Sequence, residues 1–272
     1  MNPSPNTLPP PALSGTPPAA DAIHEARAWR GLAFEANRLG VPLDEQMLTR
    51  FGAYQALLLD RNAHINLTSI TEREEVERRL FLNALAMIPA IDEILGGEAQ
   101  LRSRSVRLID IGSGAGFPGI ALKIARPDLN VVLLDATAKK VTFQRDVIAA
   151  LDLSGIEAIH GRAEELGRNA RYREAFQVAT ARAVASLPTL LELVTPYLEV
   201  GGIALLPKGV HLDEELKIGR RAARQLGCEL LDAELMPGGA SRLVRVLKTT
   251  LTPHAYPRRT GIPNRLPLGG GG

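Results

Sequence analysis

The stretch RLIDIGSGAGFPGIAL, residues Arg107–Leu122, decides the fold. It consists of an apolar run that contains Asp110, four glycines within eight residues, and a second apolar run. An apolar run that leads through a glycine-rich turn into another apolar segment is typical of a buried strand followed by a helix. Gly114, Gly116 and Gly119 also have the G-x-G-x-x-G spacing of nucleotide-binding loops. The first question is therefore which ligand this loop holds.

After this stretch, short β-rich segments alternate with helical ones. The expected strands are residues 106–112, 130–136, 156–161, 176–184 and 201–209, and the helical segments that follow them are 118–127, 139–153, 163–170, 187–198 and 212–227. Five such units predict a parallel sheet with helices on both faces. Two more strands, 228–236 and 241–250, are joined by a Pro-Gly-Gly-Ala turn without a helix. The last strand must therefore be antiparallel.

This order of elements differs from the two equal halves of a dinucleotide-binding fold. It resembles the Rossmann-like α/β fold of class I S-adenosylmethionine (SAM) methyltransferases, which has a seven-stranded sheet with an antiparallel last strand. In open sheets of this kind, ligands bind at the carboxyl edge of the strands. The glycine loop follows the first strand, so we expect it at that edge.

The chain divides into four predicted regions. Residues 1–20 are a Pro-rich leader that we expect to be disordered, because Pro and small polar residues bury too little surface to offset the cost of ordering. Residues 21–100 form a helical region, with Gly40 and Pro42 between two helices and a capping box expected at Thr71 and Glu74. The methyltransferase-like domain spans 101–250, and residues 251–272 form a basic C-terminal tail.

Composition excludes several classes of protein. The leader lacks the basic start and apolar core of a secretory signal, and no apolar run is long enough to cross a membrane. A single cysteine, Cys228, excludes a disulfide framework and a thiolate metal site. We therefore expect a cytoplasmic protein that binds neither membrane nor metal. The net charge of +2 does not indicate a nucleic-acid partner, although the part after Val200 is basic.

Several ligands are compatible with a glycine loop. A triphosphate-binding loop needs Gly-Lys-Ser/Thr, whereas this loop continues Gly-Phe-Pro-Gly. Asp110 at the end of the first strand suits the cationic methionine end of SAM and would repel a pyrophosphate. Pro118 removes one N–H that a diphosphate would need at the helix start. Asp135, at the end of the second strand, suits ribose hydroxyls, which SAM and NAD both have. These features favour SAM, with Gly112 and Gly114 beside it.

The motifs that the sequence lacks narrow the range of possible methyl acceptors. It has no Asn/Asp/Ser-Pro-Pro-aromatic motif, which methyltransferases of exocyclic amino groups use. Cys228 follows a helix-ending glycine and is expected to be a buried apolar residue, not the nucleophile of a cytosine-C5 enzyme. An acceptor that is already nucleophilic, such as guanine N7, needs no general base. Alignment and electrostatics can then supply most of the rate.

Six motifs, one of which contains the glycine loop, carry a resemblance to one family. They are NAHINLTSI (62–70), LIDIGSGAGFPGIAL (108–122), GRAEEL (161–166), ATARAVASL (179–187), LLPKG (205–209) and YPRRTGIPNRLPL (256–268). In this order they resemble the bacterial 16S rRNA guanine-N7 methyltransferase G family, also called glucose-inhibited division protein B. The resemblance implies SAM-dependent methylation of guanine N7 in the 530 loop of 16S rRNA. The implied partner is 16S rRNA or the 30S subunit and not DNA, and we expect a monomer.

The resemblance also assigns site residues. The family's cofactor contacts correspond to Gly112, Phe117, Ala163, Glu164 and Arg182 of this sequence. Arg182 would orient a carboxylate or phosphate between cofactor and substrate, and no general base is assigned. The sequence departs from the family at one place, where Gln177 replaces a common aspartate and so loses its charge.

The RNA contacts are predicted from charge. Arg258, Arg259 and Arg265 lie in a Pro/Gly-rich segment with Tyr256, which suits phosphate contacts and base stacking. Lys208 and the basic segment 217–224 would extend this surface. Two other functions stay open at this point. One is an NAD-dependent Rossmann oxidoreductase, although no tyrosine has a lysine four residues later. The other is a non-catalytic RNA-binding assembly factor.

Overall fold

A computed structural model describes residues 29–94, 106–182 and 185–269. The Pro-rich leader predicted at 1–20 and the boundary predicted near residue 100 lie outside these residues. None of the described helices is long and apolar enough to span a bilayer.

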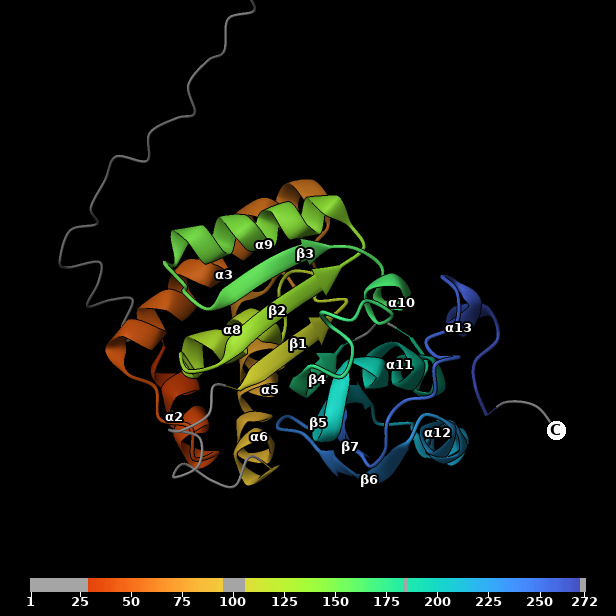
Figure 1. Cartoon of the computed structure of the whole chain (residues 1–272). Coiled ribbons are helices and arrows are strands. Elements are labelled where there is room, and N and C mark those ends of the chain that lie inside the picture. The colour runs from red at the N-terminus through yellow and green to blue at the C-terminus, as the bar shows by residue number, and fades with distance from the viewer. Residues whose placement is uncertain (1–28, 95–105, 183–184, 270–272) are drawn as a thin grey trace, which may run out of the picture.

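The centre of the molecule is a seven-stranded sheet of order β3-β2-β1-β4-β5-β7-β6 (Figure 1). The strands are β1 Arg107–Ile111, β2 Asn130–Asp135, β3 Ile156–His160, β4 Phe176–Ala181, β5 Leu198–Gly209, β6 Cys228–Leu235 and β7 Ser241–Lys248. The pairs among β1 to β5 are parallel, whereas β7 pairs antiparallel with both β5 and β6. The predicted fold class and the antiparallel last strand are confirmed.

The two faces of the sheet bury different side chains of the same strands. In β1, Leu108 packs into one apolar cluster and Ile109 into the other, as the two-residue period of a strand requires. The first face is covered by α8 (Gly119–Ala125), α9 (Ala138–Ala150) and the N-terminal helices. The second is covered by α11 (Leu187–Val194) and α12 (Asp213–Gln225), with the short α10 (Ala163–Leu166) at one end.

The N-terminal helices share the core of the sheet. They are α2 Arg30–Arg38, α3 Glu45–Ile65, α4 Arg73–Val76, the π-turn η1 Glu77–Phe81, α5 Leu82–Leu85 and α6 Ile88–Ile94. Gly40 lies between α2 and α3 at φ +76°, as expected for a helix-ending glycine. The capping box predicted at Thr71 is wrong, since α4 begins at Arg73 and Glu72 makes no side-chain cap. The helical region therefore completes the core and packs directly behind the glycine loop.

The C-terminal segment, predicted only as a basic tail, is docked on the fold. After β7 it passes through Thr252, which is buried, and forms the one-turn helix α13 (Ile262–Arg265). Pro263 and Leu268 are also buried. Cys228 is buried as predicted, and burial raises its thiol pKa to about 11. A thiol in that state is a packing residue, not a nucleophile.

Candidate functional site

A cleft of about 340 Å³ opens at the carboxyl ends of β1 and β2. This is the size of a small-molecule site, in the position where open α/β sheets bind ligands. Its described lining combines the glycine loop, the turn after β2, the end of β4 and the loop after α3: Leu67, Thr68, Gly112, Ser113, Gly114, Ala115, Phe117, Asp135, Ala136, Lys140 and Arg182. The structure thus brings together Gly112, Gly114, Phe117, Asp135 and Arg182 of the predicted set.

The four glycines of the loop have two different roles. Gly112 and Gly114 line the cleft at φ +67° and +59°, a backbone conformation that disfavours other residues. A Cβ on Gly114 would meet only Gly112 O, at 3.9 Å, so open space lies over the backbone there. A Cβ on Gly116 or Gly119 would instead lie 2.4 Å from Ile120 or 2.3 Å from Leu133. Those two glycines allow close packing of the loop on the core.

Asp135 joins the loop to the second strand. Its Oδ2 accepts from the Gly114 N–H at 2.8 Å and its Oδ1 from the Thr137 N–H at 2.8 Å. The carboxylate is held rigidly at the cleft wall, and each oxygen keeps a lone pair for a further donor. This geometry fits the predicted acceptor for ribose hydroxyls.

Asp110 lies behind the loop and is not among the residues that line the cleft, so its contact with the methionine end of SAM, directly or through water, stays a prediction. Its Oδ2 accepts from the Gly119 N–H at 2.9 Å, and the carboxyl is fully buried. Burial raises its pKa to about 7, against the opposing effects of the Gly119 N–H and of the Arg182 charge. Its Oδ1 has no hydrogen-bond partner among the described residues. Asp110 therefore shapes the loop and sets the charge beneath it.

Arg182 and Phe117 form the wall of the cleft next to the helical region. The Arg182 guanidinium lies over the Phe117 ring, 5.6 Å from its centroid, and donates to the Arg79 carbonyl oxygen at 3.3 Å. Burial lowers the pKa of Arg182, and Asp110 opposes that shift. Arg182 thus combines a fixed position with a cation facing the cleft, as an orienting residue requires.

Tyr54 of α3 supports this wall and was not among the predicted site residues. Its hydroxyl donates to the Ala115 carbonyl oxygen at 2.6 Å, and its ring stacks on Phe117 with centroids 4.9 Å apart. In the sequence it is one member of an apolar stripe in a helix, and only its hydroxyl distinguishes it. A buried hydroxyl needs a partner, which here is the glycine loop.

Other cleft residues missed from the sequence are Leu67, Thr68 and Lys140. The Thr68 N–H donates to Asn62 Oδ1 at 2.8 Å, so the end of α3 fixes this part of the rim. Leu67 and Thr68 belong to the NAHINLTSI motif, which was the available signal. Lys140 is in the first turn of α9, directly after the turn that carries Asp135.

Ala163 and Glu164 lie in α10 and are not among the residues that line the 340 Å³ cleft, so their adenine contact stays a prediction. The Ala163 carbonyl oxygen accepts from the Tyr197 hydroxyl at 2.7 Å. Glu164 is buried, and its Oε1 accepts from the Gly261 N–H at 2.9 Å. Both residues therefore join α10 to neighbouring segments.

Two of the four predicted RNA-binding residues, Lys208 and Arg258, make internal contacts. The Lys208 ammonium donates to Ala185 O at 2.8 Å and lies 2.9 Å from Glu215. Arg258 pairs with Glu192 at 2.6 Å, and the Glu192 side chain is fully buried. Arg259 and Arg265 are exposed, and their side chains have no partner among the described residues.

Gln177 lies at the amino end of β4, opposite the cleft. Its Oε1 accepts from the Arg107 N–H at 2.8 Å and its Nε2 donates to Glu199 at 2.6 Å. The amide bridges three strands in a way that a carboxylate could not, because the Glu199 contact needs a donor. The loss of charge relative to the family therefore does not affect the cleft.

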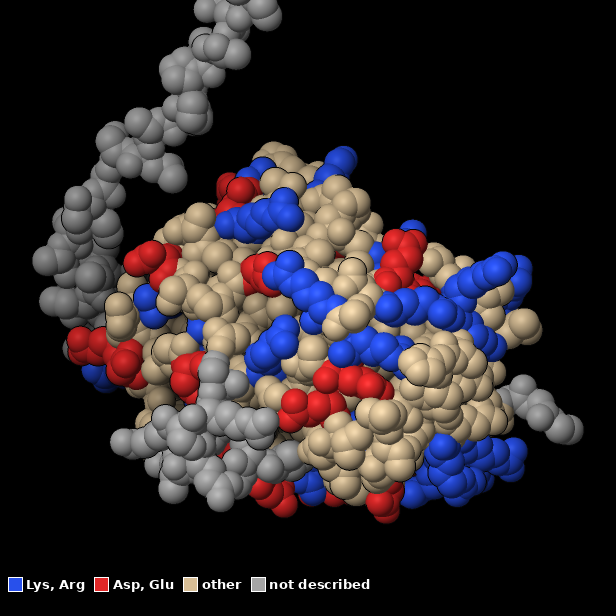
Figure 2. Space-filling model, viewed as in Figure 1, with Lys and Arg blue, Asp and Glu red and all other residues tan. Residues whose placement is uncertain are grey.

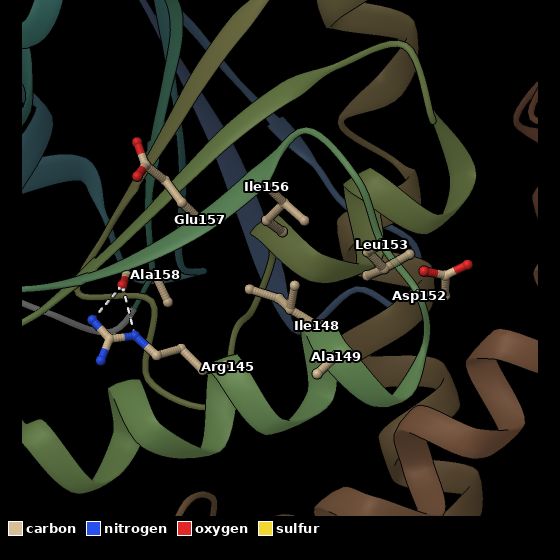
Figure 3. Close-up of a pocket in the computed structure, with 8 residues that line it drawn as sticks. All are labelled: Arg145, Ile148, Ala149, Asp152, Leu153, Ile156, Glu157 and Ala158. Atoms are coloured by element: carbon tan, nitrogen blue, oxygen red, sulfur yellow. Dashed lines mark hydrogen bonds between the residues drawn. The ribbon is translucent and has the colours of Figure 1, made fainter.

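A second hollow, of about 440 Å³, lies between α9 and β3 (Figure 3). Its lining combines apolar side chains, such as those of Ile148, Leu153 and Ile156, with the charged residues Arg145, Asp152 and Glu157. Arg145 donates to the Ala158 carbonyl oxygen there at 2.9 and 3.1 Å. Since β3 is an edge strand, this guanidinium blocks a backbone acceptor that another strand could pair with. The hollow lacks converging polar groups, so the β1–β2 cleft is the better site.

The start of α8 disfavours a dinucleotide. The Gly119 N–H is taken by Asp110 and the Ile120 N–H by Gly116 O at 2.8 Å, while Pro118 has none. A pyrophosphate binds such a helix start through free N–H groups, which these three residues do not offer. The NAD-dependent alternative therefore loses its anchoring point.

Comparison with known proteins identifies the family. A family model described as rRNA small subunit methyltransferase G matches residues 47–242. The chain belongs to this family. It is 40% identical to a protein of that name from Leuconostoc mesenteroides over 84% of this chain and 94% of the relative. A relative of the same name from Roseiflexus castenholzii is 41% identical over 86% and 97%.

One solved structure is similar at lower sequence identity. An rRNA methylase from Streptococcus thermophilus is 18% identical, with a TM-score of 0.41 over 54% of this chain and 88% of that one. This likeness concerns the fold only. The family and the seven-stranded sheet make the protein a SAM-dependent methyltransferase. The open space over Gly114 and the fixed carboxylate of Asp135 fit a nucleoside cofactor.

Proposed function

We propose that the protein transfers the methyl group of SAM to N7 of a guanine in the 530 loop of 16S rRNA. Bound SAM supplies an electrophilic methyl carbon. Gly112, Gly114 and Asp135 would hold it, and Arg182 would orient a carboxylate or phosphate beside it. Phe117 would cover the cofactor with apolar surface.

The observation that carries the guanine N7 assignment is the charge state of the cleft lining. Its titratable side chains among the described residues are Asp135, Lys140 and Arg182. Both Asp135 oxygens already accept from the backbone, and the other two groups are cations. Guanine N7 carries a lone pair and no proton, so it needs no base before attack. Alignment with the methyl–sulfur bond is then the main requirement.

The test uses the purified full chain with SAM and two substrates, naked 16S rRNA and 30S subunits. Chemical cleavage at 7-methylguanosine should give one new site, in the 530 loop, with at least one of the substrates. A methyl group at an exocyclic nitrogen or at a carbon would overturn the proposal. RNA binding without any methyl transfer would support the non-catalytic assembly factor instead. We also propose that the protein acts as a monomer in the cytoplasm, where ribosomal subunits are made.

Calorimetry separates the cofactors in the same preparation. SAM should bind and NADH should not. If the chain binds NADH and does not bind SAM, the result would support the oxidoreductase hypothesis.

A further inference from the structure

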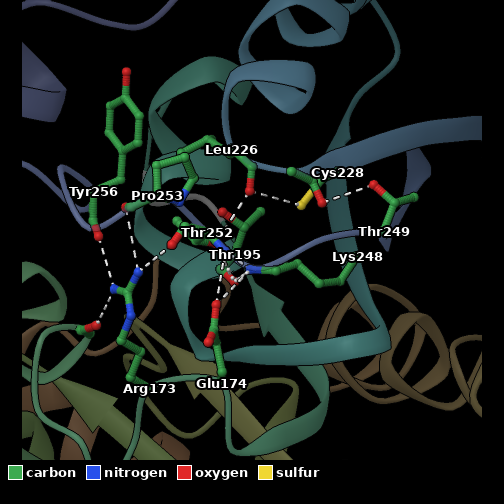
Figure 4. Close-up of polar contacts among 12 residues, drawn as sticks. Arg173, Glu174, Thr195, Leu226, Cys228, Lys248, Thr249, Thr252, Pro253 and Tyr256 are labelled. Carbon is green, nitrogen blue, oxygen red and sulfur yellow. Dashed lines mark hydrogen bonds and ion pairs between the residues drawn. The ribbon is translucent and has the colours of Figure 1, made fainter.

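The C-terminal segment 249–269 is fixed to the fold by buried and partly buried charged side chains, beginning with the partly buried Arg173. This guanidinium donates to four backbone carbonyl oxygens, those of Gly167 at 3.1 Å, Thr252 at 2.7 Å, Pro253 at 3.4 Å and Tyr256 at 2.9 Å (Figure 4). Three of the four belong to the segment. A single side chain on the sheet domain therefore sets the path of the segment directly after β7.

Lys248 provides a second anchor in the same cluster. Its side chain is fully buried, and its ammonium donates to Thr195 O at 2.8 Å and to Thr252 Oγ1. Glu174 lies 3.8 Å from the ammonium and accepts from the Thr252 N–H at 2.8 Å (Figure 4). A buried cation surrounded by acceptors constrains its neighbours, because moving them would leave the charge unpaired.

The end of the segment is held against α10 and α11. Buried Glu192 of α11 accepts from the backbone N–H of Arg258 at 2.7 Å and from its guanidinium. Buried Glu164 of α10 accepts from the Gly261 N–H. The chain between these two anchors is short, so Arg259 has a defined position on the surface beside α10.

Four arginines remain exposed around α10 after these internal contacts, and we call them the α10 patch: Arg162, Arg168, Arg259 and Arg265. Arg168 donates to Ala255 O at 3.2 Å, which ties it to the segment. The other three side chains have no partner within the described ranges. Figure 2 shows basic side chains gathered at this end of the molecule. The exposed acid nearby, Glu165, accepts a hydrogen bond from Thr260.

The α10 patch begins at the cleft. The Gly161 N–H donates to the backbone oxygen of Asp135 at 3.1 Å, and Arg162 is the next residue. On the far side of Asp135, the ammonium-bearing Lys140 lines the cleft itself. Positive charge therefore leads from the cofactor site over α10 to α13, along a surface whose backbone is fixed.

We infer that the α10 patch binds the phosphate backbone of the RNA whose guanine enters the cleft, which rests on the proposed function. Guanidinium groups match phosphate oxygens in bidentate geometry, and roughly half to two-thirds of protein–DNA hydrogen bonds go to phosphate and sugar. The buried anchors fix the backbone that carries Arg259, so binding there has to order only the side chain. Arg162 and Arg168 extend the RNA surface beyond the C-terminal segment, and Lys208 and Arg258 do not belong to it.

The test compares two triple variants of the full chain. Arg162→Ala/Arg259→Ala/Arg265→Ala removes three charges from the α10 patch. Lys217→Ala/Arg221→Ala/Arg224→Ala removes three exposed charges from α12. It is the charge-matched comparison, and it also tests the prediction from the sequence that segment 217–224 extends the RNA surface. Affinity for a labelled 530-loop RNA is measured over a series of KCl concentrations, with SAM affinity and melting temperature measured in parallel.

The patch variant should bind the RNA about 10- to 100-fold more weakly near 0.1 M salt, and the slope of log K against log salt should fall by about 2. SAM affinity and melting temperature should not change, and Arg→Lys at the same three positions should recover most of the slope. An unchanged slope, or an equal loss in the α12 variant, would overturn the inference. The inference would also be overturned if the patch variant lost binding to phosphatidylglycerol vesicles but bound the RNA as the wild type does.

The proposed function fails in a different way. If the wild-type chain binds RNA through the patch but makes no 7-methylguanosine, the guanine N7 assignment is wrong and the patch stands. If it makes 7-methylguanosine and the patch variant binds RNA normally, the patch is wrong and the function stands.

Discussion

The β1–β2 half of the sheet and the β5–β7 half use charge differently. In the first, Asp135 and Arg182 face an open cleft, and the glycine loop leaves space above its backbone. In the second, Lys248, Arg258 and Lys208 are consumed by internal contacts. The first half is built around a ligand, whereas the second uses buried ion pairs to hold a segment. A charged residue predicted from the sequence can therefore face a ligand cleft in one half and form an internal contact in the other.

The largest effect should come from breaking an anchor of the second half. Arg258→Ala leaves Glu192 buried without its cation, which should lower the free energy of unfolding by about 3–5 kcal/mol in urea titration. The adjacent Arg259→Ala should change it by less than about 0.5 kcal/mol, because that side chain is exposed. Of these two neighbouring arginines, Arg258 would then contribute to stability and Arg259 to RNA binding.

The replacement of both partners provides a control. Glu192→Leu/Arg258→Met removes the pair without leaving an unpaired charge, so it should recover much of the lost stability. If Arg258→Ala costs less than about 1 kcal/mol, the segment is held by other contacts and the distinction between the two arginines fails.

The next-largest effect tests the cleft at the ends of β1 and β2. Asp135→Ala removes acceptors for ribose hydroxyls and for the Gly114 N–H, so SAM binding should weaken by about 1.5–3 kcal/mol, roughly 10- to 100-fold. Calorimetry measures the affinity, and a melting curve checks that the chain is folded. Asp135→Asn keeps one acceptor oxygen and should lie between the two. An unchanged affinity in Asp135→Ala would remove this residue from the site.

The fold was predictable because its signals are local. Alternating strand and helix segments, the Pro-Gly-Gly-Ala turn and the glycine loop each depend on nearby residues, and all were confirmed. Gly112 and Gly114 were correctly placed because a positive φ is a backbone requirement that few residues meet. The capping box at Thr71 failed because α4 begins at Arg73, so that Glu72 and not Thr71 is the N-cap residue.

The side-chain contacts of the site were less predictable because they join distant segments. Tyr54 reaches Ala115 across 61 positions, and Arg258 reaches Glu192 across 66. The residues next to Arg258 and next to Glu192 in the sequence do not show whether these charges are buried or exposed. Arg258 and Arg259 are the clearest case, since composition predicts the same role for both and the structure separates them.

Tyr54→Phe should have a smaller effect on the first half. It removes the hydrogen bond to Ala115 and keeps the ring stacked on Phe117, so SAM affinity should fall by about 1 kcal/mol, roughly fivefold. Tyr54→Leu also removes the stacking and should weaken binding further, by about 0.5–1.5 kcal/mol. If both variants bind SAM as the wild type does, the helical region packs on the loop without positioning it.

The last prediction is of a different kind, a pH dependence of stability centred on Asp110, whose Oδ2 can accept the Gly119 hydrogen bond whether or not the carboxyl is protonated. Burial raises its pKa to about 7 in the folded chain, whereas an unfolded aspartate titrates near about 4. The folded state therefore binds more protons between these values, and this carboxyl contributes stability as pH falls from about 7 to about 4. Asp110→Asn removes the titration, so the wild type should gain stability relative to the variant over that interval in paired urea titrations. A difference that does not change with pH would mean that Asp110 is ionised throughout, with Arg182 as its effective partner beneath the cleft.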